Sequence, residues 1–135
     1  MKREIMSTKR YDEVLDMLEM DKKAIKKLTI AERQEIIRDG SAMNIAAATN
    51  IKNLKYLSTQ LRKDRTFMCN LIQNINPLAM CYCYKSWFLK KEFVEFVRDA
   101  ANAEAKKYNS PEMKELYNEL VNIQVQKAKN IGIEK

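Results

Sequence analysis

Eight basic side chains, interleaved with aromatic rings, are the residues of this chain whose types and spacing could do chemistry. They crowd residues 41–91, where Asp64 is the only acidic residue. Cations that meet phosphates, beside rings that stack on bases, are used to bind single-stranded nucleic acid, and tryptophan is enriched at the energetic centres of protein interfaces. The predicted partner-binding residues are Lys52, Lys55, Arg62, Lys63, Arg65, Lys85, Trp87, Lys90 and Lys91.

The net charge of +7 lies in this central stretch. Residues 1–40 carry 10 basic and 9 acidic side chains, and residues 92–135 carry 7 and 8. Such a local excess attracts negatively charged partners, and salt weakens the attraction. Three interpretations stay open: a solvated lysine-rich face, a surface for a protein or nucleoprotein complex with an acidic surface, and a nucleic-acid site. No RNP motif, zinc finger or recognition-helix pattern accompanies the charge.

The residue types needed for catalysis or metal binding are poorly represented. Histidine is absent, and the two glycines, Gly40 and Gly132, form no phosphate-binding loop. The cysteines are Cys69, Cys81 and Cys83, and residues two apart on a helix point about 200° away from each other. Cys81 and Cys83 are therefore poorly placed to share one ion. The sequence predicts no catalytic residue, no metal, no cofactor and three free thiols, and hence a protein that is not an enzyme.

Other charged groups are predicted to be solvated. Lys22, Lys23, Lys26 and Lys27 form a basic stripe, but five acidic residues immediately precede it, between positions 12 and 21. Paired glutamates such as Glu92 and Glu95 recur at helical spacing on polar faces, without the burial that shifts a pKa for catalysis.

The scarcity of glycine and proline predicts that helices carry the basic and aromatic side chains. The chain has 2 glycines and 2 prolines and is 46% hydrophobic, so tight turns are few. We expect an all-α fold, a compact bundle of about eight mostly short helices, with more than 60% helix and no sheet of three or more strands. Helix starts are predicted at a Thr29 capping box, at Asn76-Pro77 and at Ser110-Pro111. The helix from Thr29 is expected to end near Gly40 in a left-handed cap.

Periodic apolar faces predict the core of this fold. On each predicted helix, apolar residues recur three or four positions apart, which places them on one side. The predicted core residues are Phe67, Leu71, Leu78, Phe93, Phe96, Val97, Leu116 and Leu120.

Chain length predicts one domain over residues 1–135, with 130–135 as a frayed tail. No secretory signal or long apolar span is present, and the odd number of cysteines fits reduced thiols. We therefore expect a protein of the bacterial cytoplasm without a membrane partner. No oligomeric state is predicted.

The middle of the chain repeats itself. Leu54-Lys55-Tyr56-Leu57-Ser58, followed by Leu61-Arg62-Lys63-Asp64, has a counterpart in the segment from Asn76 to Val97. Both read as a small helix, a polar step and a second helix, with a period of about 24 to 26 residues. Residues 50–100 resemble the short helical repeats of the bacterial domain of unknown function 4116 family. Cys81-Tyr82 and Lys91 depart from that pattern. The resemblance implies helical pairs and no particular chemistry.

These patterns together predict a non-enzymatic interaction module that meets another macromolecule through its central basic and aromatic surface. Small size, positive charge and a composition typical of AT-rich genomes fit a phage-encoded inhibitor of a host defence system, of the anti-CRISPR kind, that binds a protein target. The alternative is a nucleic-acid-binding accessory protein for single-stranded DNA or RNA.

Overall fold

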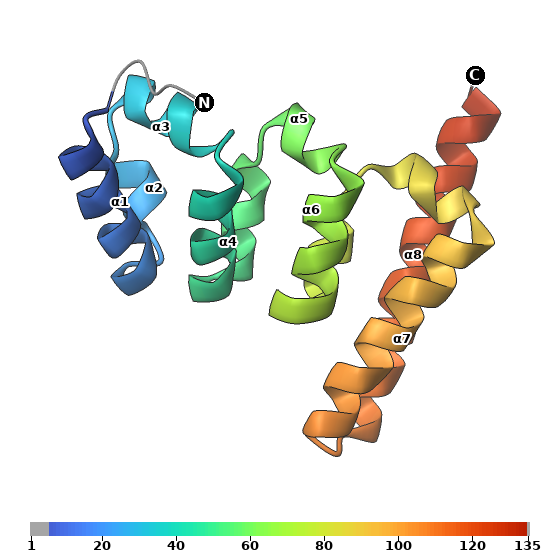
Figure 1. Cartoon of the computed structure of the whole chain (residues 1–135). Coiled ribbons are helices and arrows are strands. Elements are labelled where there is room, and N and C mark those ends of the chain that lie inside the picture. The colour runs from blue at the N-terminus through green and yellow to red at the C-terminus, as the bar shows by residue number, and fades with distance from the viewer. Residues whose placement is uncertain (1–5, 135) are drawn as a thin grey trace. The chain divides into compact units, whose positions relative to one another are not determined.

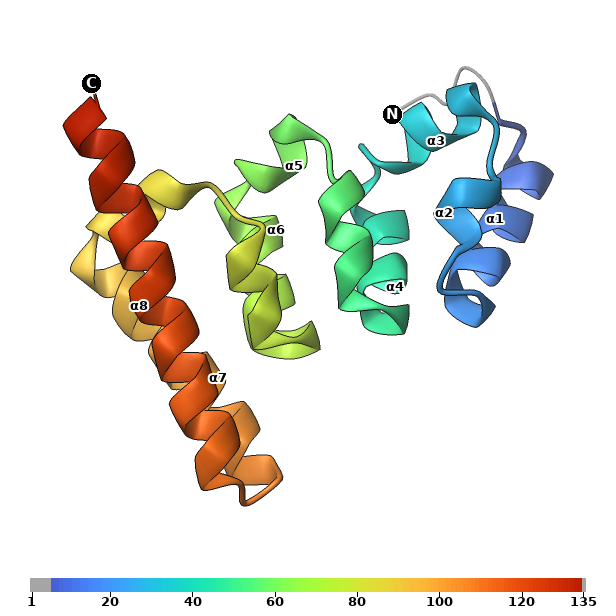
Figure 2. The same ribbon diagram turned by 180° about the vertical axis from the view of Figure 1, so that it is seen from behind.

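The computed structural model describes residues 6–134, and their side chains as far as residue 131. The chain is 82% helical, and the described residues contain no strand, which confirms the predicted all-α class. Figures 1 and 2 show the helices from opposite sides. The elements are α1 (Thr8–Met20), α2 (Ala24–Lys27), α3 (Ile30–Ile36), α4 (Gly40–Thr49), η1 (Ile51–Tyr56), α5 (Thr59–Arg62), α6 (Arg65–Asn70), η2 (Leu71–Ile75), η3 (Pro77–Cys81), η4 (Lys85–Leu89), α7 (Lys91–Lys107) and α8 (Pro111–Glu134).

Contacts group the chain into two compact units, residues 1–67 and 68–135. Unit 1 contains α1 to α5 and η1, and unit 2 contains η2 to η4, α7 and α8. The single domain predicted from chain length stays a prediction, because two contact units can fold together or separately. The tail predicted for 130–135 lies partly outside the described residues, and α8 continues to Glu134.

Unit 1 is a set of short helices held by their caps. Ser7 Oγ accepts the amide of Arg10 at 3.1 Å, and Thr29 and Glu32 form the predicted capping box. Short helices gain little from propensity, so packing and capping decide whether they form. Here α1 packs on α4, and α4 packs on η1. The apolar core of these helices includes Val14, Leu18, Ile36, Met43 and Leu54.

The left-handed cap predicted at Gly40 is wrong. Gly40 is the first residue of α4, and no described glycine has a positive φ. The reason lies one residue earlier, where Asp39 Oδ1 accepts the amide of Ala42 at 3.1 Å and starts a new helix. A Cβ at Gly40 would lie 3.5 Å from the ring of Phe67, which is ordinary van der Waals contact.

A repeated local motif underlies α2, η1 and η3. Each begins with an aspartate or asparagine whose side chain accepts the backbone amide two residues later, and a helix of four to six residues follows. This Asx geometry starts a turn without a long helix. The bonds join Lys23 N to Asp21 Oδ1 (2.9 Å), Lys52 N to Asn50 Oδ1 (3.1 Å) and Leu78 N to Asn76 Oδ1 (2.9 Å).

A basic side chain closes each copy of the motif by donating to a carbonyl near the helix end. These carbonyls lack an intrahelical partner, and a cation there also complements the helix dipole. The bonds join Arg33 Nη2 to Lys26 O (3.2 Å), Arg62 Nη2 to Lys55 O (2.9 Å) and Lys85 Nζ to Cys81 O (2.7 Å). We call the segments Asp21–Arg33, Asn50–Arg62 and Asn76–Lys85 the first, second and third repeats. The predicted repetition therefore has a third copy, before the two seen in the sequence.

Arg62 should contribute measurably to stability because its guanidinium holds carbonyls of the second repeat. Nε donates to Leu57 O at 3.2 Å, in addition to the bond to Lys55 O. Replacing Arg62 by methionine keeps an apolar stem and removes these bonds. We expect the free energy of unfolding, measured by urea titration with circular dichroism, to fall by about 1–3 kcal/mol. As a control, Gln60→Met at an exposed neighbouring position should change the free energy of unfolding by less than about 0.5 kcal/mol. Equal effects would contradict the capping role.

Unit 2 consists of three short helical segments, η2, η3 and η4, packed against a pair of long helices. α7 and α8 lie side by side in both views (Figures 1 and 2) and join through a short turn. Asn109 in that turn has φ of 48°, the left-handed conformation that asparagine tolerates at helix ends. Ser110 Oγ then accepts the amide of Met113 at 3.1 Å and caps α8, as predicted.

The core of unit 2 matches the predicted residues only in part. Leu71, Phe93 and Val97 are buried, which confirms them, whereas Leu78, Phe96 and Leu120 are half-buried. Phe67, the last residue of unit 1, was also predicted in the core and is half-buried. The prediction that Leu116 lies in the core is wrong, because this residue is 53% exposed. The face that α8 buries is Tyr117, Val121, Gln124 and Ala128.

Candidate functional site

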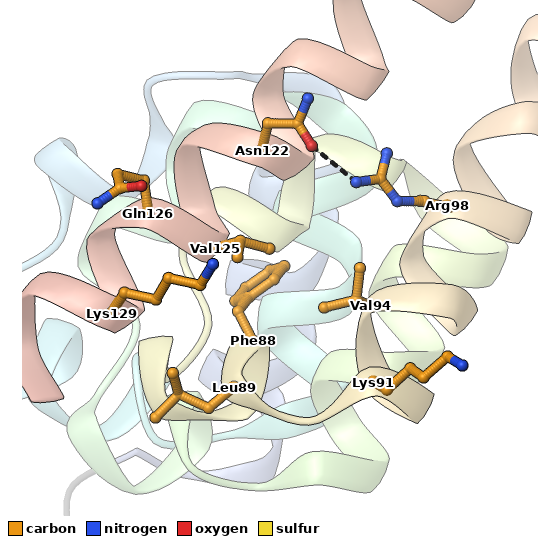
Figure 3. Close-up of a pocket in the computed structure, with 9 residues that line it drawn as sticks. All are labelled: Phe88, Leu89, Lys91, Val94, Arg98, Asn122, Val125, Gln126 and Lys129. Atoms are coloured by element: carbon orange, nitrogen blue, oxygen red, sulfur yellow. Dashed lines mark hydrogen bonds between the residues drawn. The ribbon is translucent and has the colours of Figure 1, made fainter.

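A hollow in unit 2 lies between η4, α7 and α8 (Figure 3). It has a volume of about 500 Å³. Its apolar strip consists of Phe88, Leu89, Val94 and Val125, and Leu89 is 54% exposed. Polar side chains surround the strip, and we call this hollow the basic groove. Those polar side chains are Lys91, Arg98, Asn122, Gln126 and Lys129.

Three cations and no carboxylate line the basic groove. Lys91 and Lys129 are exposed, and Figure 3 shows Lys129 extending toward Val125. The nearest carboxylate recorded for Lys91 is that of Glu95, 3.9 Å from Nζ and largely exposed, which contributes little. The groove therefore presents an excess of positive charge next to an apolar surface.

Arg98 is the best-positioned of the three cations. Its Nη2 donates to Asn122 Oδ1 at 2.7 Å, and its Nη1 donates to Asn118 Oδ1 at 3.3 Å. Both acceptors are neutral amides on α8, so they fix the guanidinium without neutralising its charge. A guanidinium held in this way is preorganised for a carboxylate, which it can bind through two parallel hydrogen bonds.

Of the predicted partner-binding residues that lie in unit 2, only Lys91 lines the basic groove. Lys90 is exposed at the start of α7. Lys85 donates to Cys81 O, so its charge is used within the third repeat. Trp87 is half-buried and packs edge-on against Tyr84 and Phe93, with ring centroids 6.1 and 5.5 Å apart.

The predicted partner-binding residues of unit 1 also include both exposed side chains and one side chain with a structural role. Arg62 points back onto backbone carbonyls, whereas Lys63 and Arg65 are exposed around the start of α6. Lys52 and Lys55 are exposed on η1 and line a smaller hollow of about 140 Å³. The nine predicted residues therefore fall on both units, and two of them have structural roles in capping.

The cysteines show no arrangement for metal binding within the part of the chain that the structure describes. No group of three or more histidine, cysteine, aspartate or glutamate side chains gathers there. Cys83 is buried, and its thiol lies 3.3 Å from Met80 O. Burial raises the pKa of Cys81, and it raises the pKa of Cys83 to about 12. A buried thiol that stays neutral, such as that of Cys83, is a poor nucleophile and a poor metal ligand.

Sequence reasoning missed the best-positioned members of the basic groove. Arg98, Asn122 and Lys129 lie outside residues 41–91, in a segment with nearly balanced charge. A signal was present in their spacing, since Asn118 and Asn122 stand four residues apart on one helix face. Only the packing of α7 on α8 shows that this face meets Arg98.

Comparison with known proteins returns no match to a family model, to a curated protein or to a solved structure. The resemblance to the domain of unknown function 4116 family stays a prediction. None of the helices described is long and apolar enough to cross a membrane.

Proposed function

We propose that this protein is a non-enzymatic interaction module that binds an acidic protein partner through the basic groove of unit 2. The observation that carries the proposal is Arg98, held by two neutral asparagines at the edge of an apolar strip. A partner segment with carboxylates beside an apolar side chain is complementary to this surface. Positive potential speeds encounter with such a partner, and a desolvated apolar contact slows its release.

Two observations favour protein over nucleic acid as the partner. Phe88 is 2% exposed, and Trp87 packs between Tyr84 and Phe93, so neither ring is an open platform for stacking bases. The exposed apolar side chain of the groove is aliphatic, because Leu89 is 54% exposed. Aliphatic surface beside arginine is suited to side chains of a protein segment. The biological role we propose, on chain length and charge alone, is a phage-encoded inhibitor of a bacterial host's defence system.

The test reverses the rim charges of the groove and leaves Arg98 in place to preserve the α7–α8 contact. The groove variant is Lys91→Glu with Lys129→Glu. The control variant, Lys9→Glu with Lys114→Glu, changes the net charge equally at two exposed lysines that do not line the groove. Lys114 and Lys129 are about 22 Å apart along α8, beyond the distance over which charges act in physiological salt.

The protein and both variants are immobilised and exposed to bacterial lysate, with and without nuclease. We expect the native protein to retain an acidic protein after nuclease treatment, and the groove variant to retain at least about tenfold less of it. The control should behave like the native protein. Loss of all retained material on nuclease treatment would favour nucleic acid. Equal recovery by the two variants would show that the groove is only solvated surface.

A further inference from the structure

A second concentration of positive charge lies in unit 1, at the hollow between α2 and η1. Its volume is about 140 Å³, and five exposed lysines line it together with Asn50, Asn53 and Tyr56. Its floor is Ile25, which is 1% exposed. No carboxylate is among the lining residues. We call this hollow the lysine pocket, and its lysines are Lys22, Lys23, Lys26, Lys52 and Lys55.

The repeats explain why these lysines gather. Lys23 and Lys52 donate the first backbone amide of their Asx turns, and Lys26 and Lys55 supply the carbonyls that Arg33 and Arg62 hold. They are therefore equivalent positions in the first and second repeats. Residues three apart on a short helix lie on the same side, so each repeat contributes one pair of lysines to the pocket.

The ammonium groups of the five pocket lysines are not held in ion pairs within the part of the chain that the structure describes. The acid next to them in sequence, Asp21, accepts the backbone amide of Lys23 on Oδ1 at 2.9 Å, and the ammonium group of Lys27 donates to its Oδ2 at 2.6 Å. The bond from Lys27 is the main cause that holds the pKa of Asp21 below its ordinary value. Lys27 does not line the pocket.

We propose that the lysine pocket binds a compact ligand that carries several phosphate groups. Ammonium groups on flexible stems bind phosphate as point charges and adapt to its spacing. Five of them around a small hollow match clustered phosphates better than a single carboxylate. The five ammonium groups repel one another in the free protein, and the negative phosphates of a bound ligand would attract them and offset this repulsion.

The extent of the pocket favours a compact ligand over a nucleic-acid strand. The third repeat carries Leu78 and Cys81 at the positions equivalent to the lysine pair, so only the first and second repeats have this pair. Tyr56 is half-buried, and Lys55 Nζ lies 5.2 Å from its ring centroid, which leaves no free ring for stacking bases. This site goes beyond the proposed function, because it is separate in residues and in ligand chemistry from the basic groove.

The test titrates the full chain with tripolyphosphate and follows binding by calorimetry and by amide NMR shifts. The pocket variant, Lys26→Gln with Lys55→Gln, removes one lysine from each repeat and leaves the capped carbonyls in place. The control is Lys9→Gln with Lys114→Gln. We expect the Kd to rise at least about tenfold in the pocket variant and less than about twofold in the control. Amide shifts should be confined to residues 22–26 and 50–56.

Several outcomes would overturn the proposal. They are no binding of tripolyphosphate, equal weakening in pocket and control variants, amide shifts outside those segments, or sulfate competing equally well at the same ionic strength. Tighter binding of a single-stranded RNA 12-mer, lost in the pocket variant, would reassign the site to nucleic acid. The groove variant, Lys91→Glu with Lys129→Glu, should bind tripolyphosphate normally. Failure of this proposal is therefore distinguishable from failure of the proposed function.

Discussion

Replacing Phe93 by alanine is expected to lower the free energy of unfolding by about 3–5 kcal/mol. Phe93 is 1% exposed, and its ring lies edge-on to Phe88 at 5.0 Å and to Trp87 at 5.5 Å. Alanine removes the buried ring and leaves a cavity that α7 and η4 can fill only by moving. Aromatic pairs with this geometry add to the burial term. Urea unfolding followed by circular dichroism measures the loss.

Leu116→Ala is the matched control for Phe93→Ala. Leu116 was predicted in the core but is 53% exposed on α8. Truncating an exposed side chain should change the free energy of unfolding by no more than about 0.5 kcal/mol. A loss above about 2 kcal/mol at Leu116 would contradict the exposed position of its side chain on α8, and a loss below about 1 kcal/mol at Phe93 would contradict the packing of α7 on η4.

Cys83 is expected to react with iodoacetamide at pH 8 about a thousandfold more slowly in the folded protein than in urea. Burial is the main cause that raises the pKa of its thiol from 9.0 to about 12, and only the thiolate reacts. The rate follows from the smaller thiolate fraction. Labelling in the folded protein and in urea, followed by peptide mass spectrometry, measures the ratio for each cysteine.

The same shift makes stability depend on alkaline pH. Folding favours the neutral thiol of Cys83, so its contribution is fully present below about pH 9 and is lost progressively as the pH rises toward 12. Cys83→Ser supplies the control, because its hydroxyl does not titrate there. Labelling of Cys83 at equal rates with and without urea would show that the thiol is accessible in the folded state.

Local signals in the sequence predicted the parts of the fold that local chemistry decides. The caps at Thr29, Asn76 and Ser110 each need a side chain and an amide within three residues, and all three form. The prediction of a helix end at Gly40 was wrong because two local signals competed there. The lack of a side chain at Gly40 suggested a helix end, but the carboxylate of Asp39 starts a helix instead.

Contacts between elements decide what the sequence could not. Helix α8 has apolar residues on two sides. The buried side includes Gln124 and Ala128, so the number of large hydrophobic residues favoured the side of Leu116, which is exposed. The site shows the same limit. Lys23 and Lys26 were predicted to be solvated next to acidic neighbours, and only the packing of two repeats places them beside Lys52 and Lys55.

The equivalence of the first two repeats has an evolutionary consequence. A tandem duplication of one such segment in the gene would insert a whole turn with its own Asx start, its own closing arginine and its own pair of lysines. Each copy brings its own local bonds, so an added copy that packs on its neighbour would add a further pair of lysines. Anion-binding capacity in such a lineage can therefore change in whole repeats, by gain or loss of gene segments.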